Sequence, residues 1–110
     1  MRKWLAFGLA WALILGGAYL AHAVQTAGGT TVAEVRIAAE KGVTVSGLLY
    51  TPSNATASTP APAVLVSHGY INTREMQSPF AIELARRGFV VLAMDMTGHG
   101  YSGGIAGTLP

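Results

Sequence analysis

Two short, continuously apolar runs constrain the fold of this chain more than any other feature. The first covers residues 63–67 and leads into a His-Gly turn at His68 and Gly69. The second covers residues 89–94 and leads into a glycine-rich loop that begins at Asp95. Apolar runs of this length, without polar alternation, are typical of strands buried on both faces of a parallel sheet. We therefore predict two neighbouring parallel strands, each followed by a polar loop.

A helix is predicted between the two runs. Ser78 is a suitable N-cap, Pro79 suits the first helical position, and Gly88 fits the C-terminal end. Strand, helix and strand in this spacing form a βαβ unit, whose crossover is right-handed in nearly all proteins. The fold class expected is therefore α/β.

An antiparallel hairpin is predicted before this unit. Residues 31–37 alternate polar and apolar side chains, residues 40–42 read as a turn, and residues 43–50 form a second strand. The loop over residues 51–62 is rich in proline, serine and threonine and shows no periodicity. The sheet of the expected domain thus begins with two antiparallel strands.

The N-terminal segment is set apart from the rest by its composition. Arg2 and Lys3 precede the uncharged residues 4–21, a length at the lower edge for crossing a bilayer. One interpretation is an uncleaved signal anchor, with the N-terminus in the cytoplasm and the domain outside it. The other is a signal peptide cleaved near Ala23, because residues 21–23 match the A-x-A cleavage pattern, which leaves the domain secreted.

We therefore divide the chain into a membrane-spanning or signal helix over residues 1–24, a linker over residues 25–30, and a domain over residues 31–110. The formal net charge of +2 comes from Arg2 and Lys3, since the domain carries five basic and five acidic residues. No basic stripe is left for nucleic acid, which excludes a nucleic-acid partner. The absence of cysteine excludes disulfides and thiolate chemistry.

The two loops resemble those of the α/β-hydrolase family. In that family a His-Gly pair follows the third strand, and a backbone N–H in this turn helps to form the oxyanion hole. The match here is His68-Gly69-Tyr70, so the resemblance implies that the amide of Tyr70 is a donor. The continuation through residues 71–75 is similar to membrane-associated bacterial members of the family.

The second loop resembles the family's Asp-x-x-Gly-His-Gly-x-Ser sequence, which shapes the wall of the site. The matching residues are Asp95, Gly98, His99, Gly100 and Ser102. The resemblance covers residues 31–104 and implies an N-terminal portion of an α/β-hydrolase sheet. In the complete family sheet the strand over residues 63–67 is an inner strand, so this portion leaves one of its edges unpaired.

Two motif matches inside this loop are rejected. Residues 100–104 read G-x-S-x-G, but a nucleophile elbow places its serine directly between a strand and a helix, and residues 105–110 are poor helix formers. Residues 98–103 read G-x-G-x-x-G, but no helix or later acidic residue follows. Ser102 is therefore interpreted as a loop serine.

The histidines also invite a metal hypothesis. His68 and His99 lie in the two adjacent loops, and the nearby carboxylates are Glu75 and Asp95. Structural hydrogen bonding is the preferred interpretation for both imidazoles, and no metal or cofactor is predicted.

The resemblance implies a serine hydrolase acting on a small-molecule ester, thioester or amide. Its nucleophile, acid and base would follow residue 104, so this chain alone is expected to be an inactive, truncated portion. The alternative is a complete, small, membrane-anchored protein that binds a partner without catalysis. The oligomeric state is not indicated by the sequence.

Overall fold

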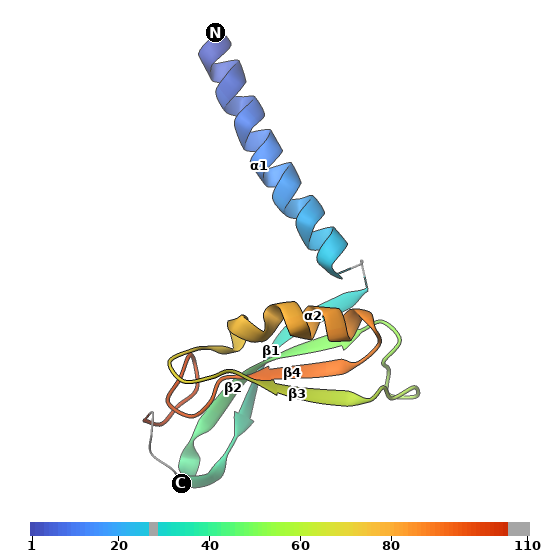
Figure 1. Ribbon diagram of the computed structural model, residues 1–110, viewed down its shortest axis with the longest axis vertical. Coiled ribbons are helices and arrows are strands. Elements are labelled where there is room, and N and C mark those ends of the chain that lie inside the picture. Colours follow the sequence, from blue (N-terminus) through green and yellow to red (C-terminus); the bar gives the residue numbers. More distant parts are fainter. Residues whose placement is uncertain (27–28, 106–110) are drawn as a thin grey trace.

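The computed structural model describes residues 1–26 and 29–105 of the chain. It holds a long N-terminal helix followed by a four-stranded sheet with one helix packed against it (Figure 1). In chain order the elements are α1 (Arg2–Thr26), β1 (Thr30–Ala38), η1 (Glu40–Gly42), β2 (Thr44–Pro52), β3 (Ala63–Ser67), η2 (Arg74–Gln77), α2 (Ser78–Arg86) and β4 (Val90–Met94). The sequence predicts that residues 105–110 form no helix. Residues 106–110 lie outside the described part of the chain.

The strands are ordered β1-β2-β4-β3. β1 pairs with β2 in an antiparallel hairpin, β2 pairs with β4 antiparallel, and β3 pairs with β4 in parallel. The predicted hairpin and the predicted strand–helix–strand unit are therefore both confirmed, and they share one sheet. Within the described part of the chain, β3 has a neighbour on one side only, and its Leu65 is 60% exposed.

The core lies between α2 and one face of the sheet. Tyr50 of β2 and Val91 and Ala93 of β4 are buried against Ala81 and Ala85 of α2. The two alanines lie four residues apart on one helix face, and their small side chains let α2 approach the sheet closely. Burying a side chain such as Val91 stabilises the fold by roughly 1.5–3 kcal/mol.

The start of α2 differs from the sequence prediction. Ser78 is the first helical residue and not the N-cap, a position that Gln77 occupies. The Ser78 hydroxyl lies 3.1 Å from the hydroxyl of Tyr50, so it connects the helix to β2 instead of capping it. The short 3-10 helix η2, which the sequence did not predict, leads directly into α2.

The N-terminal helix is long and apolar enough to cross a membrane. Its 25 residues correspond to about 37 Å at 1.5 Å per residue. Its most apolar 18-residue stretch has a mean hydropathy of 1.7, and none of that stretch is buried in the protein. A signal sequence has the same properties, so the helix is a possible span or signal by length and composition. It reaches Thr26, two residues beyond the predicted boundary.

Candidate active site

The two loops singled out in the sequence meet at one edge of the sheet. Because β3 and β4 run in parallel, residues 68–73 and residues 95–104 leave the sheet at its carboxyl edge, side by side (Figure 1). The first residues of β2 border the same edge, since Gly47 pairs with Met94. In open α/β sheets, ligands bind outside the carboxyl ends of the strands. This edge is therefore the candidate site.

A fully buried carboxylate, Asp95, holds the two loops together. Its Oδ1 accepts the backbone N–H of Arg74 at 2.8 Å, and its Oδ2 accepts the backbone N–H of Tyr101 at 3.0 Å. Its own amide donates to the carbonyl of Ser46 in β2 at 2.9 Å. Asp95 therefore links the loop after β3, its own loop and β2, and its carboxylate is occupied by the protein itself.

The guanidinium of Arg74 is the buried partner of this carboxylate. Only 4% of Arg74 is exposed, and its Nε lies 3.8 Å from Asp95 Oδ2. Its Nη1 donates to the hydroxyl of Ser46 and, at 3.2 Å, to the carbonyl of Gly47. The Tyr101 ring covers the guanidinium, with its centroid 5.0 Å from Cζ. Removing one member of such a buried pair typically costs 3–5 kcal/mol.

Gly100 allows the loop to close around the carboxylate. Its φ is +51°, a left-handed conformation that other residues adopt at a cost. A Cβ at this position would lie 2.3–2.4 Å from the carboxyl atoms of Asp95. Gly98, with a φ of +74°, also needs the conformational freedom of glycine. These glycines allow the chain to wrap tightly around Asp95.

Ser102 lies inside the loop and serves as a structural bridge. Its hydroxyl accepts the backbone N–H of Ser46 and donates to the carbonyl of Asp95, both at 2.8 Å. A hydroxyl engaged on both sides by backbone groups does not have the exposed placement of a nucleophile at a strand-to-helix elbow.

The imidazole of His68 fixes the peptide that follows it. His68 is buried, and its Nε2 accepts the backbone N–H of Met96 at 3.0 Å. The ring proton therefore resides on Nδ1, which donates to the carbonyl of Gly69 at 2.7 Å. Within the described residues, no hydrogen bond engages the backbone N–H of Tyr70. The His-Gly turn thus holds one carbonyl inward and leaves the next amide free.

The second histidine contacts the same turn from the other loop. His99 Nε2 accepts the backbone N–H of Ile71 at 3.3 Å, and the His99 ring centroid lies 5.2 Å from that of His68. Both imidazoles are thus engaged by backbone groups. Among residues 1–26 and 29–105 no group of three or more His, Cys, Asp or Glu side chains is arranged to hold a metal ion.

Glu75 is an exposed carboxylate beside this site. A hydrogen bond from the Thr73 side chain is the main cause that lowers the pKa of Glu75 below its ordinary value of 4.5. The guanidinium of Arg74 adds to this effect, and its Nε lies 3.1 Å from Glu75 Oε1. Glu75 therefore stays ionised close to the loops.

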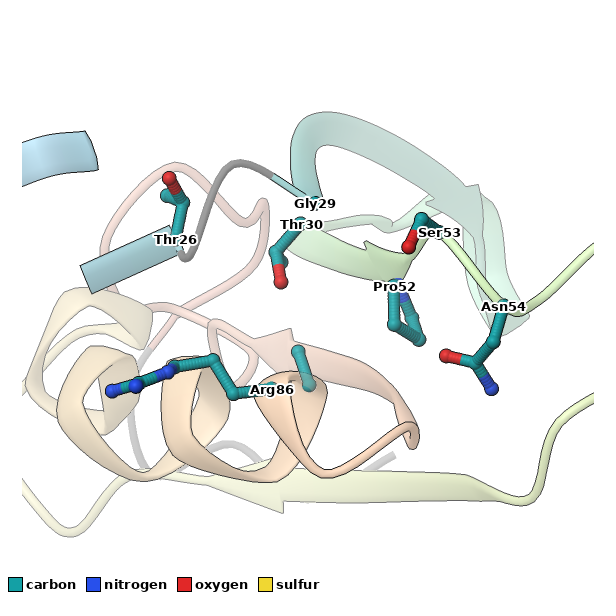
Figure 2. Close-up of a pocket in the computed structure, with 8 residues that line it drawn as sticks. Thr26, Gly29, Thr30, Pro52, Ser53, Asn54 and Arg86 are labelled. Carbon is teal, nitrogen blue, oxygen red and sulfur yellow. The ribbon is translucent and has the colours of Figure 1, made fainter. Parts of the chain in front are cut away.

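A shallow crevice lies away from these loops, near the start of β1. It encloses about 140 Å³ and is shown in Figure 2. The end of α1, the end of β2 and the last turn of α2 line it with Thr26, Gly29, Thr30, Pro52, Ser53, Asn54, Ala85 and Arg86. None of the predicted site residues borders this crevice, so it is not the site indicated by the loops.

Sequence reasoning missed Arg74 and Ser46 as site residues. In the sequence, Arg74 belongs only to the stretch after the His-Gly turn, and Ser46 only to a strand. The available signal was that Arg74 is one of few cations in the domain and follows a turn at a sheet edge. No sequence pattern in β2 distinguishes Ser46.

Comparisons with known proteins agree with this architecture. The family described as serine aminopeptidase, S33, matches residues 58–110. A hypothetical protein from Pseudomonas aeruginosa is 30% identical with a TM-score of 0.63, and the match covers 71% of this chain and 24% of that one. No curated protein gives a significant match.

Two further solved structures share the fold. The thioesterase domain from the curacin biosynthetic pathway is 24% identical with a TM-score of 0.56, covering 69% of this chain and 25% of its own. The protein DcsB, solved with a substrate analogue, is 22% identical with a TM-score of 0.59 and the same two coverages, 69% and 25%. This chain thus spans about a quarter of the length of the structures it resembles. The sheet order, the paired loops and the structural matches together show that the chain has the fold of an α/β-hydrolase sheet, and residues 58–110 are similar to the serine aminopeptidase, S33, family.

Proposed function

We propose that the chain is the N-terminal part of a serine hydrolase that acts on ester, thioester or amide carbonyls of small molecules. In this role the backbone N–H of Tyr70 is one oxyanion donor, and the loop from Asp95 to Ser102 forms the wall of the site. In the superfamily the nucleophile, the acid and the base follow this loop in that order. All three are therefore expected beyond residue 104, and residues 1–110 alone are expected to be inactive.

The chemistry requires a donor of this kind. When a serine attacks a carbonyl, negative charge develops on the carbonyl oxygen, and a fixed N–H placed to receive that charge stabilises the transition state. The loss of one such donor typically lowers kcat by about 10²–10³. A backbone amide suits the task because the fold holds it in place before the substrate arrives.

One observation carries the proposal: the hydrogen bond between His68 Nδ1 and the Gly69 carbonyl. The peptide between Gly69 and Tyr70 is trans and planar, so its N–H points opposite to its C=O. Because His68 holds the carbonyl on the protein side, the Tyr70 N–H is directed away from it. A buried imidazole, fixed by Met96, thus sets the direction of the proposed donor.

We further propose that α1 is an uncleaved signal anchor, with the domain outside the cytoplasm. Arg2 and Lys3 precede the apolar stretch, and residues 21–23 lie within α1 and not at its end. β1 begins at Thr30, four residues after the last residue of α1. Thr30 pairs with Pro52, at the end of the strands that lies opposite the two loops. The oxyanion turn would therefore face the aqueous compartment, and the expected substrates approach from water.

The test uses the natural gene product that contains this chain and a p-nitrophenyl acyl ester. Tyr70→Pro removes the backbone N–H, whereas Tyr70→Ala removes only the side chain, which is exposed. We expect Tyr70→Pro to lower kcat by about 10²–10³ with little change in KM, and Tyr70→Ala to retain most of the activity. Equal activity of the Pro and Ala variants would contradict the assignment of the donor.

A further inference from the structure

We propose that His99 is a positioning residue for the turn at Tyr70 and Ile71, and that it acts by accepting the backbone N–H of Ile71. The inference rests on the proposed role of the Tyr70 amide. It adds a second support to the turn, because His68 fixes the peptide before Tyr70 and His99 fixes the peptide after it.

The hydrogen bonds assign the state of the imidazole. A backbone N–H only donates, so His99 Nε2, 3.3 Å from the Ile71 nitrogen, is the acceptor. The ring proton then resides on Nδ1, which lies 3.2 Å from the carbonyl of Thr97 in the same loop. Both ring nitrogens of His99 are thus engaged, one within its own loop and one across to the turn.

Ile71 needs such a support because its backbone is strained. Its φ is +54°, a left-handed conformation that a β-branched residue rarely adopts. Ile71 is also 79% exposed, so packing of its side chain does not hold it there. A local hydrogen bond therefore has to maintain this conformation, and His99 supplies it.

The His99 ring also contacts the residues that surround the proposed donor. Its centroid lies 5.2 Å from the His68 ring and 6.0 Å from the Tyr70 ring. The loss of His99 would therefore remove a hydrogen bond and a ring contact from the same turn, and Tyr70 would no longer be fixed from its C-terminal side.

The test is amide hydrogen exchange, measured by NMR on the isotope-labelled 110-residue chain in lipid nanodiscs. We expect His99→Ala to accelerate exchange of the Ile71 amide about fivefold or more. His99→Gln places an amide oxygen near the position of Nε2 and should restore the exchange rate to within roughly twofold of the original. His22→Ala, which removes a histidine from α1, is the matched control and should leave the rate unchanged.

A second readout separates positioning from general loosening of the fold. The Tyr101 amide donates to Asp95 and should keep its exchange rate in His99→Ala. The backbone chemical shifts of Ile71 should no longer be those of a residue in the left-handed conformation. In the natural gene product, His99→Ala should lower kcat with KM little changed. Unchanged exchange of Ile71 in His99→Ala, or failure of His99→Gln to restore it, would overturn the positioning role.

The outcomes distinguish this inference from the proposed function. If Ile71 loosens as expected but Tyr70→Pro keeps its turnover, the oxyanion assignment fails and the support of the turn by His99 stands. If Tyr70→Pro is inactive and Ile71 exchange is insensitive to His99, the function stands and the positioning role fails.

Discussion

Replacing Gly100 by alanine should disrupt the site strongly. The left-handed φ of +51° costs an alanine about 1–2 kcal/mol. The new Cβ would also lie 2.3–2.4 Å from the carboxyl atoms of Asp95, which therefore have to move. Moving them breaks at least one hydrogen bond to a buried charge, at a further cost of about 1.5–3 kcal/mol. We expect Gly100→Ala to destabilise the domain by about 2.5–5 kcal/mol.

Two other glycines provide matched controls. Gly42 has a φ of +74° but nothing within 4 Å of a Cβ, so Gly42→Ala measures the backbone cost alone. Gly69 has neither a positive φ nor a close neighbour, so Gly69→Ala should change stability by less than about 1 kcal/mol. The three variants separate backbone strain from the clash with Asp95.

Urea unfolding in detergent micelles provides the assay. Both tryptophans lie in α1, so the tyrosine near-UV circular dichroism signal, to which buried Tyr50 contributes, should follow the domain. We expect Gly69→Ala to be the most stable of the three variants, Gly42→Ala to be intermediate, and Gly100→Ala to be the least stable. A Gly100→Ala variant as stable as Gly42→Ala would refute the argument that Asp95 is held rigidly against this glycine.

Three further outcomes are expected. Ser102→Ala should lose about 1–3 kcal/mol of unfolding free energy in the same assay, because it leaves the Ser46 amide without its acceptor; no loss would mean that the bridge is not formed. Thr73→Val should raise the pKa of Glu75 toward 4.5 in an NMR titration, since the Thr73 side chain is the main cause of its lowering. The stability that ionised Glu75 adds is present above pH 4.5 and is lost as the pH falls through its lower folded pKa, so the variant should lose less stability and complete the loss at higher pH. The intact mass of the membrane-bound protein should include residues 1–23; a mature N-terminus at Val24 would show cleavage instead.

The sheet was predictable because its signals are local. The apolar run at residues 63–67 is β3 with the same bounds, and the alternating and turn patterns of residues 31–50 gave the β1–β2 hairpin. These patterns located the strands from a single sequence, but the expected burial of β3 on both faces was wrong: its residues alternate between exposed and half-buried, because within the described residues β3 pairs on one side only.

The site was only partly predictable because its contacts are long-range. Arg74 is buried by Asp95, which lies 21 residues later on the neighbouring strand end, and no local pattern reports that pairing. Residues 74–77 form η2, which leads directly into α2, so Gln77 and not Ser78 occupies the N-cap. The positive φ of Ile71 was equally invisible, because isoleucine is among the residues least suited to it.

The most direct test of the account is to label the natural gene product with a fluorophosphonate, which reacts with activated serines, and to map the modified peptide by mass spectrometry. The account predicts a single labelled serine beyond residue 104, labelling that is lost when that serine is replaced, and no label on Ser102. A label on Ser102, or turnover by the isolated 110-residue chain, would contradict it.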